Sequence, residues 1–277
     1  MPELPEVETI RQTLKQLTIG KTIQTVDIYW PKIIQEPDDY HHFIDLIKNQ
    51  TIHDIRRKGG KFLLFDLNQH VLVSHLRMEG KYGGVYPQRE ELMAHTHVVF
   101  HFTDGTDLRY RDVRKLGTMH LQERGTELTK KPLLLVAQDP LEADFSLQTF
   151  QKKVQKSERN IKNILLDQSV IAGLGNIYVD ETLFMAGIHP LTKGLSVTDE
   201  QVIQIVEASV ATLKDAVKQG GTTIRSYVNS QGQIGMFQQK LNVYGQNDKA
   251  CRKCEDTIMK IKVNGRGTHY CPSCQPI

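Results

Sequence analysis

Four cysteines in the last 27 residues constrain the fold of this 277-residue chain more than any other feature. They form two Cys-x2-Cys pairs separated by 16 residues: Cys251, Cys254, Cys271 and Cys274. Two tight turns with this spacing can bring four thiolates into a tetrahedron around one zinc ion. A site with four protein ligands is closed to substrate, so we predict one structural Zn2+.

The segment between the two pairs has the sequence of a β-hairpin. Asn264-Gly265 is a favoured two-residue turn, with strands expected at residues 257–263 and 267–270. The unit has two acidic residues, Glu255 and Asp256, and a larger set of basic ones: Lys249, Arg252, Lys253, Lys260, Lys262 and Arg266. A basic hairpin suits a nucleic-acid backbone, but many zinc ribbons bind proteins, and both partners stay open at this point.

Composition excludes a membrane protein but little else. Hydrophobic residues make up 39% of the chain and charged residues 24%, which is ordinary for a globular protein. A net charge of +3 does not exclude DNA binding, because a basic face matters more than the total. No apolar run is long enough for a membrane span, and the acidic, proline-bearing start is unlike a signal peptide. We therefore expect a cytoplasmic protein with reduced cysteines.

The order of patterns along the chain predicts an α+β fold. Residues 7–17 have helical periodicity, and residues 21–122 have the texture of a mostly antiparallel sheet structure. The clearest strand candidates are residues 22–28, 61–67, 71–75, 98–102 and 107–110. A linker is expected near residues 129–140. Helices are expected beyond it at residues 144–154, 160–167, 179–185 and 198–218, the last with Thr198 as its N-cap.

The N-terminus is the second distinctive segment. Proline at position 2 is small enough for Met1 to be removed, which leaves a secondary amine as the new terminus. An α-amine titrates near pH 7.7–8.0 and a lysine near 10.4, so about a tenth of a typical α-amine is unprotonated at neutral pH. Such an amine can attack an electrophilic carbon and form an imine. Glu3 and Glu6 follow directly, although the same stretch also fits an ordinary lead into a helix.

Four motifs, taken together and in this order, resemble one family over the whole chain. They are PELPEVE at residues 2–8, SHLRMEG at 74–80, GNIYVDE at 175–181, and the four-cysteine finger. The chain is similar to the formamidopyrimidine-DNA glycosylases, bacterial repair enzymes that remove oxidised purines such as 8-oxoguanine. The resemblance implies an N-terminal β-sandwich flanked by helices and a helix–two-turns–helix domain that ends in the finger, with DNA in the cleft between. The domains implied are residues 1–130, 131–240 and 241–277, with a lesion-capping loop at about 220–239.

The resemblance also implies a bifunctional DNA glycosylase and lyase that acts on a flipped-out nucleotide. The Pro2 amine would form a Schiff base with the sugar, and the strand would be cleaved by β,δ-elimination. Glu3 corresponds to the proton donor, and Glu6 would orient the amine terminus. Lys61 corresponds to a lysine at the lesion phosphate, and Arg266 to the finger arginine tied to a phosphate and the second elimination. The family more often has two arginines directly before a small residue and this lysine, whereas residues 56–61 read RRKGGK.

A second set of positions matches the DNA contacts of the family. Three of them correspond to residues that contact DNA: His75, His95 and Asn176. In the family, the positions of His75 and Asn176 contact phosphates. Three correspond to residues that fill the space left by the flipped nucleotide: Met78, Arg114 and Leu116. The last of these is usually phenylalanine, so leucine can still wedge but offers no aromatic face. Three more belong to the lesion-capping loop: Thr222, Arg225 and Tyr227.

Structural roles are the alternative for several of these residues. Without the motifs, Met78 and Leu116 would be read as core residues, His75 as a buried structural histidine and Lys61 as a surface lysine. For the whole chain we predict a monomer that binds double-stranded DNA with an oxidised base. The alternatives are a pyrimidine-preferring glycosylase of the endonuclease VIII type, a non-catalytic damaged-DNA binding protein and a zinc-ribbon protein-interaction module. The PELPE start and the retained Pro2 and Glu3 count against all three.

Overall fold

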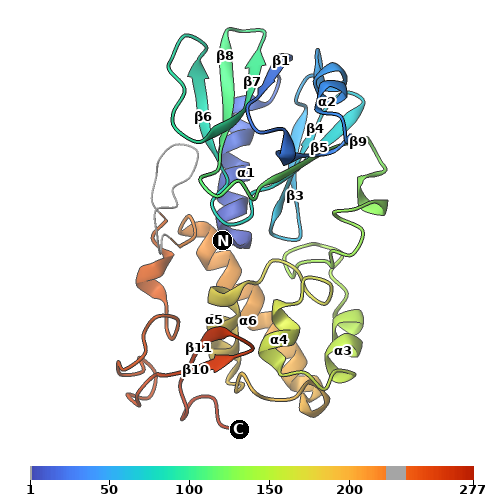
Figure 1. Cartoon of the computed structure of the whole chain (residues 1–277). Coiled ribbons are helices and arrows are strands. Elements are labelled where there is room, and N and C mark those ends of the chain that lie inside the picture. Colours follow the sequence, from blue (N-terminus) through green and yellow to red (C-terminus); the bar gives the residue numbers. More distant parts are fainter. Residues whose placement is uncertain (1, 223–234) are drawn as a thin grey trace. The chain divides into compact units, whose positions relative to one another are not determined.

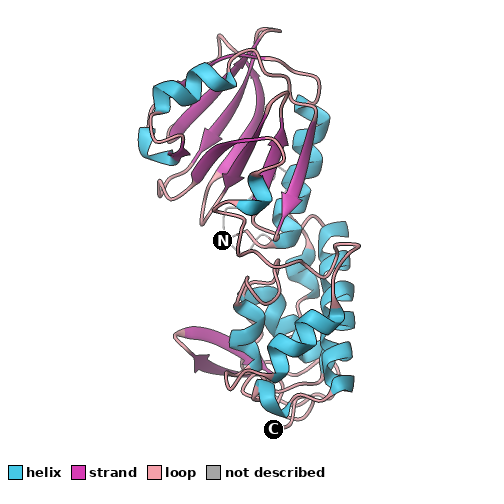
Figure 2. Cartoon of the chain, turned by 90° about the vertical axis from the view of Figure 1, so that its right-hand side faces the viewer, coloured by secondary structure: helices cyan, strands magenta, loops and turns pink. Residues whose placement is uncertain are grey.

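The computed structural model describes residues 2–222 and 235–277, which fall into two compact units. The first contains residues 2–134 with Thr222 and Gly235, and the second contains residues 135–221 and 236–277. Strands dominate the first unit and helices the second, which confirms the α+β prediction (Figure 1, Figure 2). Two predicted lesion contacts, Arg225 and Tyr227, lie outside the described residues.

Two sheets and two helices build the first unit. The sheets have the orders β1-β7-β8-β6 and β2-β9-β5-β4-β3. The strands are β1 (Ile23–Ile28), β2 (Ile34–Glu36), β3 (Asp54–Lys58), β4 (Phe62–Asp66), β5 (His70–His75), β6 (Lys81–Pro87), β7 (Thr96–Phe102), β8 (Thr106–Arg111) and β9 (Thr118–Glu123). The helices are α1 (Leu4–Thr18) and α2 (Tyr40–Ile47), with short 3-10 turns at Pro31–Ile33 and Glu127–Thr129. Apolar side chains from both sheets and from α1 and α2 form one continuous core, as the sandwich prediction requires.

The second unit is a set of helices that carries the finger. The helices are α3 (Leu147–Gln155), α4 (Ile161–Leu166), α5 (Asn176–Ala186) and α6 (Asp199–Lys218), with 3-10 turns at Gly194–Ser196 and Phe237–Lys240. The finger hairpin is β10 (Met259–Val263) and β11 (Arg266–Tyr270). Thr198 accepts a hydrogen bond from the N–H of Gln201, so the predicted cap of α6 is confirmed.

Several element boundaries differ from the sequence predictions, most clearly in the second unit. Helix α3 begins at Leu147 and not at residue 144, because the Ser146 hydroxyl accepts from the Thr149 N–H and caps the helix there. Helix α5 begins at Asn176, three residues earlier than predicted. The end of the predicted 220–239 loop overlaps the 3-10 turn at Phe237–Lys240. Among the described residues, no helix is both long and apolar enough to cross a membrane.

Candidate functional site

The start of α1 gathers the predicted nucleophile and its carboxylates. Pro2 is buried, and Glu3 and Glu6 are each only 5% exposed. The N–H of Glu3 donates to Glu6 Oε2 at 2.9 Å. The second oxygen of Glu6, Oε1, accepts from the N–H of Thr222 at 2.7 Å and from its hydroxyl at 3.1 Å. Glu6 therefore joins the N-terminus to the point where the chain returns to the first unit, and Thr222 contacts Glu6.

Lys61 and His75 lie at one end of the five-stranded sheet. Phe62 of β4 pairs with His75 of β5, and Lys61 directly precedes β4. The turn before Lys61 contains Gly59 and Gly60, which have φ angles of 60° and 63°. These left-handed values favour glycine. Residues 56–61, which differ from the usual family pattern, therefore form a tight turn that leads directly into β4.

His75 is a neutral hydrogen-bond donor in this position. Burial lowers its pKa to about 3, with further lowering from the positive charges of Arg77, Lys61 and His120. Its Nδ1 accepts from the N–H of Arg77 at 2.9 Å. Because a neutral imidazole carries one hydrogen, that hydrogen is on Nε2, where it can be donated to a phosphate oxygen.

The two loops with the predicted space-filling residues lie next to the end of β5 and the start of β9. His75 pairs with Thr118 of β9, so residues 76–80 and 112–117 begin and end beside one another. Met78 is 39% exposed and Leu116 is 44% exposed, and Arg114 is exposed between them in sequence. These side chains are not part of the core, which weakens the purely structural interpretation of Met78 and Leu116.

His95 lies near this group. His95 is exposed and has a φ of 65°, and its carbonyl accepts a hydrogen bond from the N–H of Asp112 at 3.1 Å. Thr96, the next residue, pairs with Arg111 at the end of β8. The loop before β7 and the loop after β8 are therefore held together at their base.

In the second unit, Asn176 contacts the finger hairpin. Its Nδ2 donates to the carbonyl of Gly267 at 3.0 Å, and its Oδ1 is buried with no partner among the described residues. Arg266 is exposed and directly precedes Gly267, after a turn whose Asn264 and Gly265 have φ angles of 45° and 76°. Asn176 and Arg266 are thus neighbours in space, although 90 positions separate them in the sequence.

A buried ion pair anchors the same hairpin on the helices. Lys162 Nζ of α4 lies 2.7 Å from Asp180 Oδ1 of α5, and both side chains are 0% exposed. Lys162 also donates to the Gly267 carbonyl at 3.2 Å, and Asp180 Oδ2 accepts from the N–H of His269 at 2.8 Å. The hairpin is therefore fixed through its backbone by two charges to which the sequence analysis gave no role.

The four finger cysteines fit a zinc ion. Their sulfur atoms lie within 4.8 Å of one another, with 3.9 Å between Cys251 and Cys274 and 3.4 Å between Cys254 and Cys271. A tetrahedron with Zn–S bonds of about 2.3 Å has edges of about 3.8 Å, which is close to these separations. The four thiolates would hold one Zn2+ as a structural ion, as the spacing predicted.

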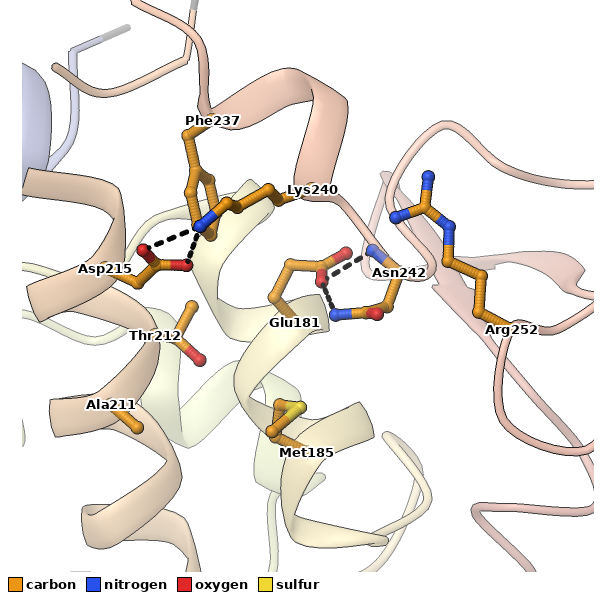
Figure 3. A pocket seen from close by; sticks show the side chains of 9 residues that line it. All are labelled: Glu181, Met185, Ala211, Thr212, Asp215, Phe237, Lys240, Asn242 and Arg252. Carbon is orange, nitrogen blue, oxygen red and sulfur yellow. Dashed lines mark hydrogen bonds and ion pairs between the residues drawn. The ribbon is translucent and has the colours of Figure 1, made fainter. Parts of the chain in front are cut away.

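A cavity of about 420 Å³ lies between α5, α6 and the start of the finger (Figure 3). Asp215 and Lys240 form an ion pair at 3.0 Å on one side, and Arg252 extends over the other. Glu181 lies beneath, and it accepts from the N–H groups of Asn242, Val243 and Tyr244, each at 2.9 Å, and from the Asn242 side chain. Burial raises the pKa of Glu181, although these donors oppose the shift. Glu181 thus binds the backbone of residues 242–244, and the cavity marks the joint between α5 and the finger.

Comparison with known proteins assigns the chain to established domains. The family model described as "Formamidopyrimidine-DNA glycosylase N-terminal domain" matches residues 1–119. The model "Formamidopyrimidine-DNA glycosylase H2TH domain" matches residues 136–228, and "Zinc finger found in FPG and IleRS" matches residues 248–277.

Relatives and solved structures agree over the full length. The formamidopyrimidine-DNA glycosylase of Shouchella clausii is 55% identical and that of Oceanobacillus iheyensis 54%, over all of this chain and 99% and 98% of theirs. A Lactococcus lactis FPG variant in complex with Fapy-dG containing DNA has a TM-score of 0.92 at 36% identity, with each chain covered completely. The Lactococcus lactis Fpg in complex with abasic site containing DNA has a TM-score of 0.91 at 36% identity, covering 99% of this chain and 100% of the other.

Proposed function

Because the chain belongs to the formamidopyrimidine-DNA glycosylase family, we propose that it excises formamidopyrimidines and 8-oxoguanine from duplex DNA through the Pro2 amine. It is a base-excision repair glycosylase with lyase activity at abasic sites. The neighbouring structures with Fapy-dG and abasic DNA support both as ligands of this chain. It acts as a monomer on cytoplasmic, nucleoid DNA. The proposal depends most on the buried group formed by Pro2, Glu3 and Glu6.

The chemistry begins once removal of Met1 frees the Pro2 nitrogen. Its lone pair attacks C1′ of the flipped nucleotide, and the base departs with the electron pair of its bond to C1′. The nitrogen then loses its proton and its lone pair opens the sugar ring, whose oxygen takes a proton from Glu3. The product is an iminium, which acidifies the C2′ hydrogen. Loss of that hydrogen expels the 3′ phosphate, and a second elimination expels the 5′ phosphate.

Glu6 orients this group and does not react. Its two oxygens are occupied by the Glu3 N–H and by Thr222, so it has a fixed position beside the nucleophile. Because the carboxylate accepts from Glu3, the N-terminal residues cannot rotate freely about the start of α1. A nucleophile held in its attack geometry avoids much of the entropic cost of the reaction.

We assign phosphate contacts to four further residues. In the first unit these are Lys61 and the Nε2–H of His75. In the second unit they are Asn176 and Arg266, whose planar, permanently charged guanidinium suits a phosphate. Because His75 is neutral, it contributes a hydrogen bond and no charge. The four thiolates of the finger would hold the zinc ion, which would supply a structural link.

A borohydride trap tests this proposal. The protein is incubated with a duplex that carries one formamidopyrimidine or 8-oxoguanine opposite cytosine, reduced, and mapped by peptide mass spectrometry. We expect a covalent adduct on Pro2, which would establish the nucleophile and the removal of Met1 together. Pro2→Gly keeps an α-amine but loses its secondary character, so strand cleavage should fall while lesion binding is retained. Tight lesion binding with no adduct would instead favour a non-catalytic damage sensor, and an adduct on a lysine would overturn the assignment of Pro2.

A further inference from the structure

The residues proposed to fill the space left in the DNA duplex by the flipped nucleotide lie on two loops of the first unit, residues 76–80 and 112–117. We propose that Asp112 is a positioning residue which, with Tyr110, holds these loops as one rigid platform for Met78, Arg114 and Leu116. This inference rests on the proposed function, because it concerns how the space-filling side chains are presented to DNA.

The carboxylate of Asp112 organises the second loop from inside. It is 1% exposed, and its oxygens accept from three backbone N–H groups of the loop. Oδ1 accepts from Arg114 at 3.0 Å, and Oδ2 accepts from Leu116 and from Gly117 at 2.8 Å each. An ionised carboxylate forms stronger hydrogen bonds than a neutral acceptor, so three such bonds define the backbone on both sides of Leu116.

The backbone of Asp112 ties this loop to the strand beside it. Its carbonyl accepts from His97 Nε2 at 2.8 Å, and its N–H donates to the carbonyl of His95 at 3.1 Å. His97 is 6% exposed, so this bond is made in the interior. The carboxylate therefore holds the loop, while the main chain of the same residue holds the proposed DNA contact His95.

Tyr110 couples the two loops. Its side chain is fully buried, and its hydroxyl oxygen lies against the backbone of Gly80 and of Gly117. A Cβ atom would be 2.1 Å from that oxygen at Gly80 and 1.8 Å at Gly117, so neither position can accept a side chain. Gly80 closes the loop of Met78, and Gly117 closes the loop of Leu116. Displacement of either loop would press on the same tyrosine.

The outer side of the second loop rests on Trp30. The Nζ atom of Lys115 lies 4.2 Å from the centroid of the indole ring, within the range of a cation–π contact. Lys115 has a φ of 55°, so its backbone is in the left-handed region between Arg114 and Leu116. Trp30 is the only tryptophan in the sequence. Its fluorescence therefore reports on the environment of this loop.

The proposal predicts a specific defect in Asp112→Asn. An amide cannot accept at both ends, so at least one N–H of the loop loses its acceptor. We expect excision from a lesion duplex to fall by about tenfold to a hundredfold, as small displacements of positioned groups can cause. Cleavage of an abasic site in single-stranded DNA should change much less, because no base stack has to be filled. Without DNA, acrylamide should quench Trp30 more strongly in the variant than in the wild type.

Asp107→Asn is the matched control, because Asp107 is equally buried on β8 but bonds His101 and Arg109 away from the loop. It should leave the ratio of duplex to single-strand activity and the Trp30 quenching unchanged. If Arg114→Ala and Leu116→Ala also leave that ratio unchanged, the proposed space-filling roles are wrong. If those two variants lower the ratio and Asp112→Asn does not, the positioning role is wrong.

Lys115→Met gives a second test that does not disturb a buried group. Methionine keeps the length of the side chain but removes the nearer of two charges over Trp30, the other being Lys32 at 5.6 Å from the ring centroid. Stronger quenching of Trp30 and a ratio lowered by about threefold would support the platform. Unchanged quenching and an unchanged ratio would overturn it, even if Asp112→Asn failed to fold.

Discussion

Lys162→Met should loosen the finger hairpin while the helices stay folded. In the wild type, Lys162 and Asp180 are fully buried and lie 2.7 Å apart, and both bond the backbone of β11. Methionine fills similar space but leaves the Asp180 carboxylate without its cation. Removal of one partner of a buried pair costs about 3–5 kcal/mol. We take about 3 kcal/mol, since His269 still donates to Asp180.

This loss of about 3 kcal/mol applies to the local opening of the finger hairpin. A free energy of about 3 kcal/mol corresponds to a factor of about 150 in the opening equilibrium. If thiol modification proceeds through that opening, its rate rises by the same factor. The assay follows zinc release to a chromogenic chelator while a thiol reagent attacks the four cysteines. Asp180→Asn added to Lys162→Met removes the unpaired charge and should recover much of the loss.

Arg159→Met is the control for this prediction. Arg159 forms an ion pair with Asp167 at 2.9 Å, but the two side chains are 48% and 30% exposed. Exposed pairs contribute about 0–1 kcal/mol, so the release rate should change by less than about fivefold. If Lys162→Met releases zinc no faster than Arg159→Met, the buried pair does not hold the hairpin and our reasoning is refuted.

Three other outcomes are expected. The pKa of His75 is lowered to about 3 in the folded protein, whereas an unfolded histidine binds a proton below about pH 6.5, so acidification lowers the free energy of unfolding. Between pH 7 and pH 5 this loss is about 2 kcal/mol, and denaturation experiments should show that His75→Gln avoids it. Glu6→Gln keeps only one acceptor oxygen for Glu3 and Thr222, so single-turnover excision should slow by about tenfold while lesion affinity in anisotropy titrations stays within about threefold. Zinc removal should weaken duplex binding by at least about tenfold and flatten its salt dependence, whereas an unchanged slope would mean that the finger does not touch phosphates.

The finger could be predicted in detail because its information is local. The two Cys-x2-Cys pairs and the Asn264-Gly265 turn lie within a few residues of the structures they define, and the left-handed φ angles of the turn agree with it. Strand β3 lies in the predicted sheet region but is not among its clearest strand candidates, for the opposite reason. Its residues Arg56 and Arg57 look like a solvated charge run, but they pair with Asp66, Glu127 and Glu8 on other elements.

Strand β6 and the start of α5 were hidden by their glycines. β6 contains two glycines and an irregular register between Tyr82 and Val85, so it lacks the alternation of an ordinary strand. At α5, Gly175 takes the N-cap position with no side-chain cap, so no capping residue marks the helix start. In both cases tertiary packing stabilises an element for which the local sequence gives no clear signal.

The site residues that could be predicted are those in the family motifs, including buried ones such as Glu3, Glu6 and His75. Met78, Arg114 and Arg266 follow from motifs, since residues that meet the substrate are part of the family pattern. The contact between Glu6 and Thr222 joins positions 216 residues apart, and no local pattern announces it. Asp112 had a usable signal, because an aspartate two residues before a loop amide often bonds to it, but three amides on one carboxylate could not be foreseen.

The buried carboxylates share a chemistry that suits a protein that must hold DNA. Glu6, Asp112 and Asp180 are each at most 5% exposed, and each accepts a backbone N–H bond from a segment that carries a proposed contact. A carboxylate on the surface of such a segment would repel phosphates. Buried and saturated with amide donors, it gives the segment a fixed shape, and the low-dielectric protein around it strengthens those bonds. The exposed Arg114 and Arg266 of the same segments are then not neutralised by these carboxylates.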